Sequence, residues 1–216
     1  LHSFPTRRSS DLDLRAPAGL MGSLLLDPEN VTIASDGETP GLPATGDTTL
    51  TATGDDSRLS VAILESALAL GNVIVSTGSS GSQAGDITVA ANIGWTGNNS
   101  LSLSAYRNIT INDGVTIVNT GAGDLSLVAD STGTGTGTVV FDGTGSADWS
   151  RSTGAVSIFY NPSDNPAGSQ INTTSYTSPV DFSSAVRGQL TAYMLVNTAY
   201  DLQNMRNALS GAFAIG

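Results

Sequence analysis

The chain has 216 residues and a formal net charge of −11, yet only 12% of its residues are charged. An acidic chain repels nucleic acids and anionic membrane surfaces, so neither is expected as a partner. The absence of cysteine excludes disulfides and thiolate metal sites, and no run approaches the ~20 apolar residues of a membrane-spanning helix.

Residues 1–12, LHSFPTRRSSDL, differ in character from the rest of the chain. They contain its only histidine, His2, and the adjacent arginines Arg7 and Arg8. A signal peptide places basic residues before an apolar run, whereas no apolar run follows these arginines. Back-translated, the segment resembles a widely used short-read sequencing adapter read in frame. We therefore interpret 1–12 as a non-native artefact, which leaves a native part without histidine, lysine or cysteine.

Residues 13–58 are predicted to form β-coils and turns, and residues 59–71 a short helix. The inward face of this helix is formed by apolar residues at helical spacing: Leu59, Ile63, Ala67 and Leu70. Asp56 or Ser57 is expected to cap its start, and Gly71 to end it.

A repeated unit fills residues 72–160: a turn of Gly, Asn or Asp, followed by a short strand in which apolar and small polar residues alternate. This alternation places one face inward and the Ser/Thr face outward. The inward pairs are predicted to be Val73/Val75, Ile87/Val89, Leu101/Leu103, Ile109/Ile111, Leu125/Leu127, Val139/Phe141 and Val156/Ile158.

Short strands between such turns are compatible with a β-sandwich or with a parallel β-helix. Sequence spacings of about one coil favour the β-helix, because residues at these spacings belong to strands of similar sequence. Ile87 to Ile109 is 22 residues, Leu101 to Leu125 is 24, and Trp95 to Ile117 is 22. The step from Ile109 to Val139 lengthens to 30, which we attribute to an insertion at 131–138. The predicted fold class is therefore all-β, a parallel β-helix with one or two short helices.

Residues 161–188 carry three prolines and are predicted to be a linker or an excursion. Residues 189–216 are expected to form a strand and a second helix, which Gly211 ends. The predicted inward residues of this helix are Leu202, Met205 and Leu209. We expect the native protein to continue beyond both ends of this sequence.

Five stretches resemble the exoprotein repeats of filamentous-haemagglutinin-like proteins, which are large bacterial adhesins exported by two-partner secretion. These stretches are GSLLLDPENVTIASDG (22–37), ILESALALGNVIVSTG (63–78), GDITVAANIGWTGNNSLSLSAYRNITIN (85–112), STGAVSIFYNP (152–162) and LTAYMLVNTAYDLQNMRNALSGAFAIG (190–216). The resemblance implies a right-handed parallel β-helix and a place outside the cell. Neither the Asn-Pro-Asn motifs of the family's secretion domain nor an Arg-Gly-Asp tripeptide occurs in the sequence.

No catalytic, cofactor-binding or metal-binding residue is predicted. Ser-His-Asp triads and lysine bases need residues that the native part lacks. Carboxylate chemistry, as in β-helical polysaccharide hydrolases or lyases, would need several acidic groups on one face. The loose candidates are Asp130, Asp142 and Asp148 with Arg151, all at turn positions where Asp is common for backbone reasons.

Four weaker patterns each have a structural interpretation that we prefer. Trp95 and Trp149 either form a sugar-stacking platform or fill one corner of the core beside Ile117. The run GDD at 54–56 suits calcium or a turn, and GTGTG at 133–137 lacks the lysine of a phosphate-binding loop. The glycosylation pattern occurs at Asn30, Asn98, Asn108 and Asn172, where asparagine also serves as a turn residue.

The sequence thus predicts a structural, adhesive, non-enzymatic segment of a secreted or surface-exposed bacterial exoprotein. Its expected partners are ligands on host or neighbouring cells and, during export, an outer-membrane transporter; no nucleic acid, cofactor or integral membrane segment is expected. The alternative is a polysaccharide-active β-helix, which would bring carboxylates together in a cleft. An immunoglobulin-like sandwich would instead contain antiparallel hairpins.

Overall fold

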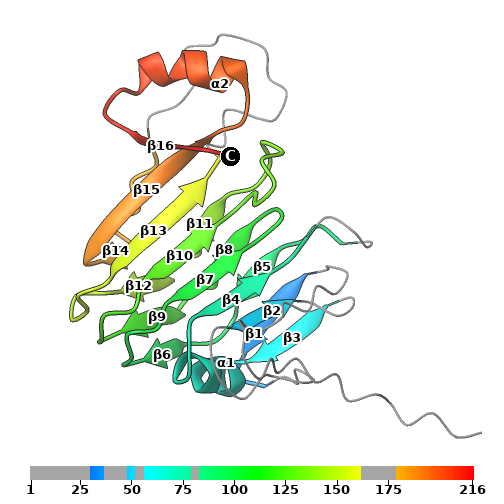
Figure 1. The fold of residues 1–216 in the computed structure, drawn as a ribbon, viewed down its shortest axis with the longest axis vertical. Helices are drawn as coiled ribbons and strands as arrows, with labels where there is room; N and C mark the ends of the chain where they lie inside the picture. Colours follow the sequence, from blue (N-terminus) through cyan, green and yellow to red (C-terminus); the bar gives the residue numbers. More distant parts are fainter. Residues whose placement is uncertain (1–29, 37–47, 52–55, 79–82, 162–178) are drawn as a thin grey trace, which may run out of the picture.

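The computed structural model describes residues 30–36, 48–51, 56–78, 83–161 and 179–216. These residues form three parallel sheets, which we call A, B and C, and two short α-helices (Figure 1). Every strand pair among them is parallel. The prediction of a mostly β fold with parallel strands is confirmed, because a sandwich would contain antiparallel hairpins. The artefact predicted at 1–12 lies outside the described residues, as does most of the excursion predicted at 161–188.

The three sheets have the following members in spatial order. Sheet A contains β11 (Val139–Phe141), β8 (Ile109–Ile111), β5 (Ile87–Val89), β1 (Val31–Ala34) and β3 (Ser57–Ser60). Sheet B contains β16 (Ala212–Ile215), β15 (Gln189–Val196), β13 (Ala155–Tyr160), β10 (Leu125–Val128), β7 (Leu101–Ser104), β4 (Val73–Ser76) and β2 (Thr48–Thr51). Sheet C contains β14 (Val186–Arg187), β12 (Ser146–Asp148), β9 (Thr116–Asn119) and β6 (Ile93–Trp95).

From β5 to β13 the chain visits the sheets in a constant order, A then C then B. It does so three times, through β5–β6–β7, β8–β9–β10 and β11–β12–β13. Each circuit lays its strands beside those of the previous circuit, so residues one circuit apart become neighbours.

The interior is mainly aliphatic, and most strands supply two inward residues to it. All the predicted inward residues of the strands at 72–160 are buried except Phe141, which is only partly buried. Phe141 lies on β11, at the end of sheet A in the described structure, and its ring packs edge-on against Phe182. Tyr160 meets Phe182 in the same way, so the interior becomes aromatic near β13.

Three of the four predicted alignments are confirmed. Ile87 pairs with Ile109, Leu101 with Leu125, and Ile109 with Val139 across the longer step. The alignment of Trp95 with Ile117 is wrong, because Ile117 pairs with Ile93 and Trp95 pairs with Asn119. A shift of two residues keeps the same face inward, so alternation alone does not distinguish the two registers.

Helix α1 spans Val61–Leu68, and its predicted face and caps are wrong in part. Leu59 lies on β3, because backbone pairing with β1 makes residues 57–60 a strand. Leu70 lies beyond the end of the helix and is exposed. The helix therefore starts after Ser60, without an Asp56 or Ser57 cap, and it ends before Gly71 is reached. Its buried residues are Val61, Leu64, Ala67 and Leu68.

Helix α2 (Ala199–Asn204) continues into a 3-10 turn, η1 (Met205–Asn207), and its predicted inward face is wrong. Leu202 is 59% exposed and Leu209 is 81% exposed, while Met205 is partly buried. A capping box between Thr198 and Asp201 turns Asp201 inward, since its carboxylate accepts the N–H groups of residues 197 and 198. Asn204 and Ala208 then share that buried face, at helical spacing from Asp201.

Strand β1 departs from the regular succession. It precedes β3 in the chain, yet it lies between β3 and β5 in sheet A (Figure 1). No pattern in the sequence predicts this intercalation.

Candidate functional site

The candidate carboxylates stand at three different corners. Asp130 follows β10 of sheet B, Asp142 follows β11 of sheet A, and Asp148 ends β12 of sheet C. The described residues contain no group of three acidic side chains close enough to share a metal ion. The described structure therefore does not bring these residues together as a hydrolase or lyase site would require.

Asp148 is engaged locally. The hydroxyl and N–H of Ser150 hold the pKa of its carboxyl below the usual value, and the charges of Arg187 and Arg151 add to this effect. The guanidinium of Arg187 lies 3.8 Å from the carboxylate, so Arg151 is not its sole cationic neighbour.

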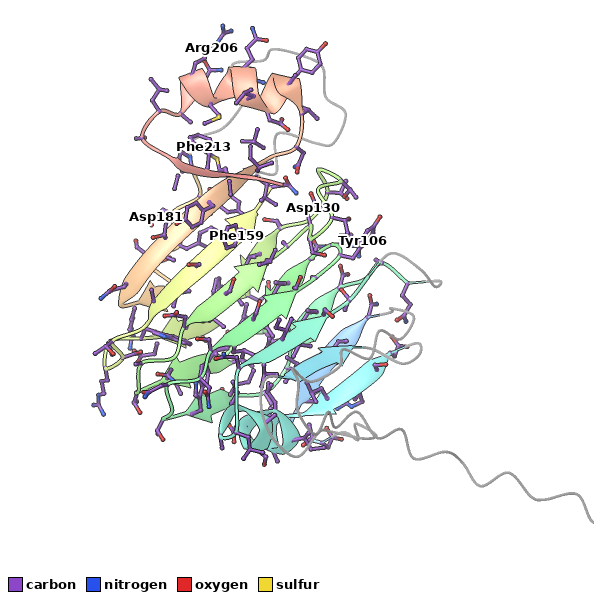
Figure 2. The ribbon with its side chains drawn as sticks, viewed as in Figure 1. Tyr106, Asp130, Phe159, Asp181, Arg206 and Phe213 are labelled. Atoms are coloured by element: carbon purple, nitrogen blue, oxygen red, sulfur yellow. The ribbon has the colours of Figure 1, made fainter. Side chains whose placement is uncertain are left out.

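Asp130 is 2% exposed and acts as an anchor for the loop that follows it (Figure 2). Its carboxylate accepts the N–H of Thr134 at 2.7 Å, the hydroxyl of Thr134 at 2.6 Å and the N–H of Gly135 at 2.7 Å. The side-chain amide of Asn161 donates a fourth hydrogen bond at 2.8 Å. Both carboxylate oxygens accept hydrogen bonds, so the GTGTG segment wraps around Asp130 instead of forming a phosphate loop.

A chain of amides extends from this carboxylate along the stack. Asn197 donates to Oδ1 of Asn161 at 2.7 Å, and Asn161 donates in turn to Asp130 and, at 3.1 Å, to the carbonyl of Gly137. These three side chains follow β15, β13 and β10 of sheet B. They therefore tie successive strand ends together at one corner.

Both tryptophans belong to the core. Trp149 is 1% exposed and Trp95 is 7% exposed, and their rings pack edge-to-face at 5.5 Å. Each indole N–H donates to a backbone carbonyl of a turn, that of Asn99 or Gly123. The core interpretation is confirmed, since both side chains are buried and their rings pack against each other.

Asparagines of the glycosylation patterns bridge successive turns. Oδ1 of Asn30 accepts the N–H of Asp86 at 2.9 Å, and Oδ1 of Asn108 accepts the N–H of Thr138 at 3.0 Å. Asn98 makes a longer contact of the same kind. These contacts agree with the turn interpretation, while Asn172 lies outside the described residues.

Asp86 forms a two-pronged ion pair with Arg107, at 2.9 and 2.6 Å. Burial raises the pKa of Asp86, but the hydrogen bonds from Arg107 and from the N–H of Asn108 outweigh it and hold the pKa below its usual value. This pair joins the turns before β5 and β8.

The outward face of sheet B is the broadest candidate contact surface. Its outward positions include Ser76, Ser102, Ser104, Ser126, Ser157 and Thr191, with the apolar residues Ile74 and Val128 in register among them. Phe159 and Tyr193 stand in register among them and stack at 4.9 Å with 15° between their rings (Figure 2). This pair was not among the predicted site residues; the signal for it was an aromatic residue at outward positions that carry Ser76, Ser104 and Val128 on β4, β7 and β10.

A cavity of about 410 Å³ lies between α1 and β6, lined by Glu65, Leu68, Ala69, Gly94, Trp95, Thr96 and Gly97. Within it the N–H of Gly94 donates to Glu65 at 2.8 Å. Helix α1 thereby covers the free edge of sheet C.

No group of three metal-ligating side chains occurs in the part of the chain that the structure describes. Asp56 of the GDD run contacts Gln83 there, and Asp55 lies outside that part. No helix among the same residues is long and apolar enough to cross a membrane. No family model, curated protein or solved structure matches the chain.

Proposed function

We propose that the chain is a segment of a right-handed parallel β-helix and serves as a rigid, adhesive, non-enzymatic scaffold. The observation that carries this proposal is the path of the chain, which passes through sheets A, C and B three times in succession and places aliphatic residues in register inside. When each coil rests on its neighbours, a rod grows at constant cross-section. The parent protein is proposed to be a secreted or surface-exposed bacterial exoprotein of the filamentous-haemagglutinin-like type, exported through an outer-membrane transporter.

The adhesive part of the proposal rests on the outward face of sheet B. Its serine and threonine hydroxyls offer hydrogen bonds without charge, and the stacked pair Phe159 and Tyr193 offers apolar surface. Such a surface suits many weak contacts with ligands on host or neighbouring cells.

The non-enzymatic part is supported by the separation of Asp130, Asp142 and Asp148 at three corners. The polysaccharide-active alternative is tested by incubating the chain with a panel of polysaccharides and measuring new reducing ends and unsaturated products. We expect no product. Product formation that Asp148→Asn abolishes would establish the alternative instead.

Export and adhesion are tested separately. Antibodies raised against the chain are expected to label intact source bacteria, and labelling only after lysis would overturn surface exposure. Beads coated with the chain are expected to bind host or neighbouring cells. The double variant Phe159→Ser/Tyr193→Ser should reduce this binding, whereas Val140→Ser, an exposed apolar residue on sheet A, should leave it unchanged. If the double variant and Val140→Ser bind cells equally well, the outward face of sheet B is not the adhesive surface.

A further inference from the structure

The intercalated strand β1 occupies a slot in sheet A that the rest of the chain leaves between β3 and β5. Val31 pairs with Ser57 on one side and with Ile87 on the other, and Ile33 pairs likewise with Leu59 and Val89. β1 is the sole sheet partner of β3 in the described structure. The slot is therefore a strand-binding site whose occupant is visible.

The fit of β1 is specific in both backbone and side chains. Val31 and Ile33 are buried inside the stack. The N–H of Val31 donates to Asp86 at 2.9 Å, and the carbonyl of Ile33 accepts the N–H of Ala90 at 2.8 Å. A strand with two inward β-branched residues thus satisfies the apolar and the backbone requirements of the slot together.

Gln83 marks the entrance to this slot. Its Oε1 accepts the N–H of Asn30 at 2.8 Å and the N–H of Asp56 at 3.1 Å. One side-chain amide therefore contacts the residue before β1 and the residue before β3. Asn30 in turn accepts the N–H of Asp86 through its side chain. None of these contacts depends on the covalent connection between β1 and β3.

The flanking strands are also matched to each other. Ser57 and Ile87 share the partner Val31, and the buried residues Leu59 and Val89 share the partner Ile33. With β1 absent, β3 and β5 would meet in the same register with their apolar residues on the same face. Pairing of β3 with β5 in the absence of β1 would therefore keep the inward face of sheet A apolar at Leu59 and Val89.

We propose that this slot is a site of strand exchange, in which residues 30–36 of a second copy of the chain take the place of β1 and two copies form a swapped dimer. The exchanged strand makes the same contacts in either copy, so the dimer costs little beyond association. β1 ends at Ala34 and β2 begins at Thr48, so thirteen residues join the exchanged strand to the rest of the stack. This proposal rests on the topology of sheet A and is independent of the adhesive function.

The lack of cysteine makes a clean cross-linking test available. Thr32, Thr88 and Thr110 form an outward, partly exposed row on β1, β5 and β8. Neighbouring strands lie about 4.8 Å apart, within the reach of a disulfide, whereas Thr32 and Thr110 are two strands apart and beyond it. Full-length Thr32→Cys and Thr88→Cys chains are unfolded, mixed in equal amounts, refolded at high concentration and oxidised.

We expect a disulfide-linked two-chain product on a non-reducing gel from Thr32→Cys with Thr88→Cys, and none above background from Thr32→Cys with Thr110→Cys. The double variant Thr32→Cys/Thr88→Cys, alone and dilute, should close within one chain. If it closes in this way but the mixture yields no two-chain product above the Thr110→Cys control, exchange does not occur. If even the double variant fails to close, β1 does not occupy the slot and the proposal falls as well.

Discussion

Glycines at the corners let successive turns approach each other closely. A methyl group on Gly123 would overlap the carbonyl oxygen of Asn99, in the turn one circuit earlier, and would lie 3.0 Å from the indole nitrogen of Trp95. A methyl group on Gly97 would meet no atom closer than 3.9 Å. A comparison of substitutions at the two positions therefore distinguishes the effect of close stacking on stability from the general effect of replacing a glycine.

We expect Gly123→Ala to lower the free energy of unfolding by about 1–3 kcal/mol, because the backbone at Asn99 or at residue 123 would have to move. Gly97→Ala serves as the control and should stay within about 0.5 kcal/mol of the parent chain. Urea unfolding followed by circular dichroism measures both. Equal losses would show that the turns do not stack as closely as the structure indicates.

A second prediction at this scale concerns pH. The pKa of Asp86 is lowered in the folded chain, so its contribution to stability is present above its unfolded pKa of about 3.9 and is lost as the pH falls through the folded value. We expect Asp86→Asn to lower the Tm at pH 7, and we expect its difference from the parent chain to shrink below about pH 4. Asp142→Asn, at an exposed position, should follow the parent chain at both pH values. A constant difference across this range would refute the assignment.

At the scale of elements, helices replace strands where the circuit is incomplete. Helix α1 stands beside β6 and gives the edge of sheet C a hydrogen-bond partner through Glu65 and Gly94. The carbonyl of Leu68 likewise accepts the side-chain amide of Asn99 at 2.8 Å. Unpaired strand edges are sites of unwanted association, and α1 covers this one.

We expect Glu65→Ala to cost about 0.5–1.5 kcal/mol, because it leaves the N–H of Gly94 without its acceptor. Glu65→Gln retains an acceptor oxygen and should lose less. Hydrogen exchange of the Gly94 amide, measured by NMR, distinguishes a lost hydrogen bond from a general weakening of the fold. Unchanged protection in Glu65→Ala would mean that the helix does not serve this edge.

At the scale of the whole molecule, the inward residues of neighbouring strands contact each other along the stack, so their contributions to stability should be coupled. Leu127 on β10 is fully buried and lies between Leu103 on β7 and Ile158 on β13. Ile33 on β1 is equally buried, but it lies in sheet A among other partners. In a structure that grows by nearest-neighbour contacts, energetic coupling should follow this adjacency.

We expect Leu127→Ala to cost about 2–5 kcal/mol, whereas Ser126→Ala on the outward face should cost less than about 0.5 kcal/mol. The double variant Leu127→Ala/Leu103→Ala should depart from additivity, because its two sites share a cavity. Leu127→Ala/Ile33→Ala should be additive within about 0.5 kcal/mol. Denaturant unfolding of the set tests this, and the reverse pattern would contradict the nearest-neighbour description.

The sequence by itself determined most of the inward strand residues, because alternation acts locally, and the spacings of about one coil favoured parallel strands over a sandwich. It also predicted three of the four alignments. Only the tertiary structure decided the register of Trp95, since a shift of two residues preserves the alternation. The inward face of α2 depended on the capping box at Thr198, and the start of α1 depended on pairing between β3 and β1. The place of β1 between β3 and β5 joins segments distant in the chain, so no local pattern encodes it.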